Sequence, residues 1–201
     1  DTRAHVQWTI EDMDAYQSKP DIKAELIKRA TSAHGRAIDT NILAKLDTHS
    51  GHQVAGVLTA SKITEGIQFL DQNFAMDEGR FLVINSAARN ALLSINDFVR
   101  ADSMGSSNIP KGVIGELYGV QVIVHAGAAK NYLYSKEAIA WAFQKGAQYD
   151  EDKAIGYGTG SYLAVMDQLF GSKAVRLGEG KELDNATTIG AAESPFIVEI
   201  G

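Results

Sequence analysis

The chain has 201 residues, of which 45% are hydrophobic, and its formal net charge is −6. This length allows one large domain or two small ones, and the negative charge argues against nucleic-acid binding driven by phosphate neutralisation. No apolar run approaches the roughly 18 residues of a membrane span, the first residues show no signal-peptide pattern, and without cysteine the chain lacks disulfides and thiolate chemistry.

The first quarter of the chain predicts one strand and one long helix. Residues 4–10 alternate between apolar and polar side chains, which indicates a half-buried strand. Apolar residues then recur at helical spacing over residues 20–48, a helix of about 40 Å at ~1.5 Å per residue. Ile38 lies on the apolar stripe of this helix, so we expect an aspartate there to cost several kcal/mol. Gly35, in the middle of the helix, indicates a bend or close packing.

Helices and strands alternate through the middle of the chain. The pattern predicts a second helix over residues 59–73 and a turn that ends at Gly79. A buried strand at residues 81–84 follows, and Ser86 is the predicted N-cap of a short helix that ends near Ser94. The last third predicts short strands separated by glycine turns.

A stretch rich in glycine, KGVIGELYGVQVIVH, occupies residues 111–125 and contains Gly112, Gly115 and Gly119. A dinucleotide-binding fingerprint has its glycines after a strand and at the start of a helix. Here the glycines precede a strand, and no helical pattern follows His125. The spacing therefore favours a structural role for these glycines.

Other motifs give weak signals for chemistry. GYGTGS at residues 156–161 lacks the Lys-Ser/Thr pair of a phosphate-binding loop. His49 and His52 follow the end of a helix with no third metal ligand nearby. The acidic segments 11–14 and 149–152 lack the glycine and final glutamate of an EF-hand loop, and no nucleophile-elbow motif is present. We therefore predict no catalytic residue, no metal site and no cofactor.

The ordered set of motifs resembles the major capsid proteins of tailed bacteriophages, whose fold is named after phage Hong Kong 97. Each motif is degenerate alone, but their order and spacing extend over roughly residues 4–178. The motifs are TIEDMDAYQS (Thr9–Ser18), AIDTNIL (Ala37–Leu43), FLDQNFAMDEGRFLVIN (Phe69–Asn85), SAARNALL (Ser86–Leu93), the glycine-rich stretch and LFGSKAVRL (Leu169–Leu177). Met76 and His125 depart from the residues usual in the family.

The resemblance implies an α/β (α+β) fold of the Hong Kong 97 type, with a long spine helix, a peripheral domain and an inserted axial domain. The implied bounds are 1–50 for the first peripheral part, 51–135 for the axial domain, 136–182 for the returning peripheral strands and 183–201 for a C-terminal segment. Candidates for structural or assembly roles are Ile38, Gly79, Arg80, Gly112, Gly115, Gly119 and Gly171.

The function implied by the resemblance is structural. Copies of the chain would form the hexamers and pentamers of an icosahedral phage head that encloses DNA, assembled in the bacterial cytoplasm with scaffolding, portal or decoration proteins. An encapsulin-type compartment shell and a nucleotide-binding α/β enzyme that uses residues 156–161 are the alternatives. Family members carry an N-terminal arm and an extended loop before the first strand, and this sequence shows neither. We therefore expect a chain beginning at Asp1 to fold without closing shells alone.

Overall fold

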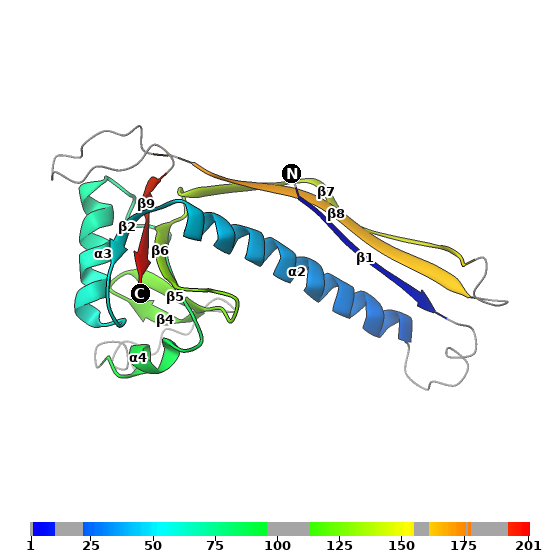
Figure 1. The fold of residues 1–201 in the computed structure, drawn as a ribbon, viewed down its shortest axis with the longest axis horizontal. Helices are drawn as coiled ribbons and strands as arrows, with labels where there is room; N and C mark the ends of the chain where they lie inside the picture. Colours follow the sequence, from blue (N-terminus) through cyan, green and yellow to red (C-terminus); the bar gives the residue numbers. More distant parts are fainter. Residues whose placement is uncertain (1, 11–21, 96–112, 155–160, 176, 178–192) are drawn as a thin grey trace. The chain divides into compact units, whose positions relative to one another are not determined.

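The computed structural model describes residues 2–10, 22–95, 113–154, 161–175, 177 and 193–201. These residues divide into two compact units: unit 1 comprises residues 1–42 and 141–172, and unit 2 comprises residues 43–140 and 173–201. The elements in chain order (Figure 1) are β1 (Thr2–Ile10), α2 (Ile22–Thr48), β2 (Ser50–Val54), α3 (Ala60–Gln72), β3 (Arg80–Ile84), α4 (Arg89–Leu93), β4 (Val113–Leu117), β5 (Val120–Val124), β6 (Asn131–Ser135), β7 (Ile139–Lys153), β8 (Tyr162–Ala174) and β9 (Ser194–Ile200). No helix in the described ranges is long and apolar enough to cross a membrane.

Unit 1 is a three-stranded sheet, in the order β1-β8-β7, with one face covered by α2. Strand β1 pairs antiparallel with β8, so that Val6 lies opposite Met166. Alternate residues of β8 are buried, as expected for a sheet with one covered face. His34 of α2 is 3% exposed, and its Nε2 donates to the Met166 carbonyl at 3.2 Å. Helix α2 confirms the long helix predicted from the sequence, and Ile38 of this helix is half-buried.

Helix α2 continues through Gly35, where a Cβ would meet no atom within 4 Å. The expectation of close packing at this glycine is therefore wrong. Because the site is open and helical, Gly35→Ala is expected to raise the free energy of unfolding by about 1 kcal/mol. Urea unfolding of the two proteins measures the difference. A less stable alanine variant would show that the helix needs glycine at this position.

Unit 2 is built on a six-stranded mixed sheet, in the order β2-β9-β6-β3-β5-β4. Strand pairs β2–β9 and β3–β5 are parallel, whereas β9–β6, β6–β3 and β5–β4 are antiparallel. Helix α3 packs on this sheet, close enough that a Cβ on Gly66 would lie 2.9 Å from Leu133. The largest fully buried side chains of unit 2 are Tyr132, Leu46, Ile63, Leu70, Leu82, Ile84, Leu92, Leu133 and Ile197.

Three local predictions need correction. Helix α4 begins at Arg89 rather than after Ser86, because the Asn85 Oδ1 accepts from the Ala88 N–H at 2.7 Å and closes a turn there. The glycine-rich stretch forms both strands of a hairpin, and Gly115 lies within β4 rather than ahead of the strand. The last third has long strands instead of short ones, since β7 has 15 residues and β8 has 13.

Candidate assembly surfaces

Arg80 organises the turn between α3 and β3 in unit 2. Its side chain is 5% exposed and donates to two backbone carbonyls, Ala75 at 2.7 Å and Met76 at 3.0 Å. The same guanidinium pairs with the carboxylates of Asp71 at 2.7 Å and Asp77 at 2.9 Å. Five donors in a fixed plane suit this set of acceptors, which a lysine ammonium would not match. Arg80 thus holds the whole turn in one conformation.

Phe74 lies in this turn and caps the C-terminal end of α3 in a Schellman motif. The Ala75 N–H donates to the Leu70 carbonyl and the Phe74 N–H to the Asp71 carbonyl, both at 3.0 Å. The motif requires a left-handed residue, and Phe74 has φ 59°. Glycine or asparagine usually fills this position, since other residues are disfavoured by roughly 1–2 kcal/mol. Phe74 is nevertheless 90% exposed.

Two of the predicted glycines are required by backbone conformation. Gly79 ends the turn between α3 and β3 and has φ 80°. Gly119 has φ 78° in the β4–β5 hairpin turn, where its neighbour Tyr118 has φ 53°. A Cβ on Gly119 would meet no atom within 4 Å, so the structural role of Gly119 is the turn and not close packing. Gly115 lies in β4, Gly171 lies in β8, and Gly112 falls outside the described residues.

Strand β7 forms a long exposed edge of unit 1. It is the last strand in the order β1-β8-β7 of the described sheet, and residues 141–150 are all exposed. Trp141 and Phe143 are 53% and 45% exposed, and their rings meet edge to face with centroids 4.9 Å apart. A strand edge offers unpaired backbone groups to another chain, and exposed aromatic side chains are typical of protein interfaces. This edge is suited to contact with another protein.

The chain matches the family model described as phage capsid protein over residues 4–181. The chain belongs to the phage capsid protein family. No curated protein sequence matches it at a significant level.

The solved structures similar to this capsid protein share its fold at low sequence identity. A Mycobacterium phage Che8 structure matches with a TM-score of 0.74 at 15% identity, over 100% of this chain and 71% of that one. The capsid of cyanophage P-SCSP1u gives 0.71 at 12% identity, over 100% and 72%. The head of Helicobacter pylori bacteriophage KHP40 gives 0.70 at 12% identity, over 99% and 73%. The α+β fold of the capsid protein is thus the Hong Kong 97 type predicted from its motifs.

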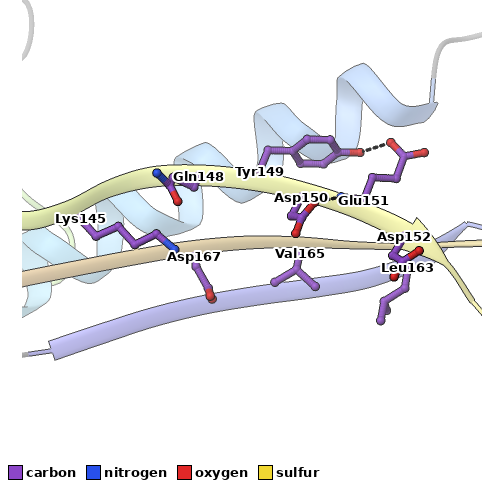
Figure 2. Close-up of a pocket in the computed structure, with 9 residues that line it drawn as sticks. All are labelled: Lys145, Gln148, Tyr149, Asp150, Glu151, Asp152, Leu163, Val165 and Asp167. Carbon is purple, nitrogen blue, oxygen red and sulfur yellow. Dashed lines mark hydrogen bonds between the residues drawn. The ribbon is translucent and has the colours of Figure 1, made fainter.

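A groove of about 550 Å³ lies along β7 and β8 of the capsid protein. Figure 2 shows the side chains of its lining, including the hydrogen bond of 2.7 Å that the Tyr149 hydroxyl donates to the Glu151 carboxylate. This hydrogen bond raises the pKa of Tyr149 to about 12. Glu151 also pairs with Lys23 at 2.7 Å, so the predicted acidic segment 149–152 is engaged in contacts within unit 1. The nine lining residues include no serine, cysteine or histidine for nucleophilic catalysis.

His52, one of the two histidines considered as metal ligands, packs against an aromatic side chain. The His52 ring stacks on Phe69 with centroids 4.4 Å apart, and burial lowers the pKa of His52. No group of three or more His, Cys, Asp or Glu side chains in the described ranges is placed to hold a metal ion. Residues 156–160 and the acidic segment 11–14 lie outside those ranges.

In the capsid protein, the exposed face of the unit 1 sheet carries a cluster of charged side chains that contains a histidine. The His5 Nδ1 lies 2.7 Å from the Asp167 Oδ1, and Arg3 pairs with the other oxygen of Asp167 at 2.6 Å. The hydrogen bond with Asp167, supported by Gln7, raises the pKa of His5 above its ordinary 6.5. The hydrogen bond with His5, followed by that with Arg3, lowers the pKa of Asp167 below 3.8.

These pKa shifts determine how the stability of the folded protein changes with pH. The stabilisation from His5 is complete below pH 6.5 and is lost as the pH rises through its raised folded pKa. The stabilisation from Asp167 is complete above pH 3.8 and is lost as the pH falls through its lowered folded pKa. An NMR titration is expected to give His5 a pKa above 6.5, which Asp167→Asn shifts back down. An unchanged His5 titration in Asp167→Asn would contradict the pairing.

Proposed function

We propose that copies of this capsid protein assemble into a closed icosahedral shell that encloses the DNA genome of a tailed phage. The observation that carries the proposal is the match to the phage capsid protein family over residues 4–181. The exposed β7 edge and its aromatic pair support it, because a lattice needs surfaces that meet other copies. Many modest contacts of this kind cooperate through multivalency.

We further propose that the two units form different domains of the shell subunit. Unit 1, with β1, the larger part of α2, β7 and β8, serves as the peripheral domain. Unit 2, with its six-stranded sheet, serves as the axial domain around the fivefold and sixfold axes of the shell. In this proposal the chain needs no cofactor and performs no catalysis. It assembles in the cytoplasm of the bacterial host, where scaffolding, portal or decoration proteins are its further partners.

The net charge of −6 supports the part of the proposal that concerns DNA. An acidic shell protein repels the phosphate backbone, so it can contain packed DNA without adhering to it. Neither alternative from the sequence gains support. The family match and the fold do not favour an encapsulin-type compartment, and residues 156–160 of the nucleotide-binding alternative lie outside the described residues.

The proposal is tested by expressing the full-length gene product that contains this chain in a bacterium. Mass photometry and negative-stain electron microscopy are expected to show closed particles of uniform size. A thermal-shift series with nucleotides and Mg²⁺ is expected to leave the melting temperature unchanged. Monomers that are stabilised by a nucleotide would contradict the shell function and favour the enzyme.

A further inference from the structure

We propose that Phe74 anchors the contact between neighbouring copies of the capsid protein, seated against the Arg89–Leu93 face of α4 in the next copy. This inference rests on the proposed shell function. It identifies which two surfaces of unit 2 meet between neighbouring copies. It goes beyond the family assignment, which identifies no contact residue of this chain.

The first observation is that Phe74 is unfavourable for an isolated subunit. The Schellman position at the end of α3 is left-handed, with φ 59°, and it favours glycine or asparagine. Phenylalanine adds backbone strain there, and its ring gains no burial because it is 90% exposed. Strained residues persist where function requires them. The benefit of this side chain therefore lies in a contact outside the subunit.

The second observation is that the turn presents Phe74 rigidly. Arg80 is 4% exposed and bonds the carbonyls of Ala75 and Met76, the two residues that follow Phe74. The Schellman hydrogen bonds fix Phe74 from the helix side. A preorganised side chain loses little conformational freedom on binding, and aromatic residues held in this way are typical interface hot spots.

The third observation is the charge around Phe74. The side chains of Asp71 and Asp77 are 54% and 92% exposed, and Glu78 beside them is also exposed. Two basic side chains lie beside these three acidic ones: Arg80 is buried beneath the turn, and the Lys136 side chain passes beside Gly79. A complementary surface therefore combines an apolar side chain with a neighbouring cation.

The described part of unit 2 contains such a surface on α4. Leu93 is 48% exposed, and Arg89 is exposed four residues earlier, on the same side of the helix. The turn between α3 and β3, which contains Phe74, precedes β3, and α4 follows the end of β3. The two surfaces therefore lie at opposite ends of this strand. Different surfaces that meet between identical copies make a head-to-tail contact, which closes into a ring when the rotation permits. A second copy of this chain is thus the partner.

Phe74→Gly is the main test, made in the full-length gene product. The variant subunit is expected to be at least as stable as wild type in urea, because glycine suits the left-handed position. Its critical concentration for shell assembly is expected to rise at least about tenfold. Val57→Ser is the matched control, since Val57 is 75% exposed in the same unit without left-handed backbone. The control is expected to assemble like wild type.

Charge reversal tests the α4 surface separately. Glu78→Arg is expected to weaken assembly, and Arg89→Glu in the same chain is expected to restore it. Shells from Phe74→Gly at the wild-type critical concentration, or a less stable Phe74→Gly subunit, would overturn the role of Phe74. A double variant no better than Glu78→Arg would overturn the assignment to α4. If wild type itself forms no shells, the proposed function fails rather than this contact.

Discussion

Arg80→Met is expected to lower the free energy of unfolding of the unassembled subunit by about 3 kcal/mol. The substitution keeps most of the side-chain volume but removes every donor that the turn between α3 and β3 uses. The carbonyls of Ala75 and Met76 lose charged hydrogen-bond donors, and Asp71 and Asp77 lose their common partner. Urea unfolding followed by circular dichroism measures the change.

Two further variants isolate the cause of this loss. Arg80→Lys restores the charge but not the planar array of donors, so an intermediate stability is expected. Arg89→Met removes an exposed arginine from the same unit and is expected to change the stability of the unassembled subunit by less than about 0.5 kcal/mol. Equal losses in Arg80→Met and Arg89→Met would show that Arg80 does not hold the turn.

Gly51→Ala is expected to destabilise unit 2 by about 2–3 kcal/mol. A Cβ at this position would clash with the Ser194 carbonyl oxygen and would lie 2.8 Å from the Ser194 carbonyl carbon. These are backbone atoms of β9, where the Ser194 N–H also donates to the His49 carbonyl at 2.8 Å. The strands must therefore separate at the irregularity between Ser50 and His52.

Gly146→Ala is the matched control for Gly51→Ala. Gly146 also lies in a strand, β7, but a Cβ there would meet no atom within 4 Å. The control is expected to unfold at nearly the wild-type urea concentration. If both alanine variants unfold alike, the close approach of β2 and β9 at Gly51 has no energetic importance.

The elements that the sequence predicts well are those with a local cause. The spacing of apolar residues predicts α2 and α3, and the buried run before Asn85 predicts β3. Gly79 marks a left-handed turn because glycine adopts that conformation without strain. The ordered motifs also indicate the family that the comparison confirms.

The features that the sequence does not predict depend on distant partners or on unusual residue choices. Gly51 is constrained by Ser194, which is far away in the chain and joins it only through the β2–β9 pairing. Phe74 gives no signal for a left-handed cap because phenylalanine is rare there. Arg80 is identified by its place in the family motif, but its buried bonds to Ala75 and Met76 depend on the folded turn.

The most direct test of the central claim is cryo-electron microscopy of particles from cells that express the full-length gene product. The account predicts closed icosahedral shells whose repeated subunit has the fold described for this chain. In the map, the Phe74 ring is expected within about 4.5 Å of side-chain atoms of a neighbouring copy. Purified protein that remains monomeric, or a shell in which Phe74 faces solvent in every copy, would contradict the account.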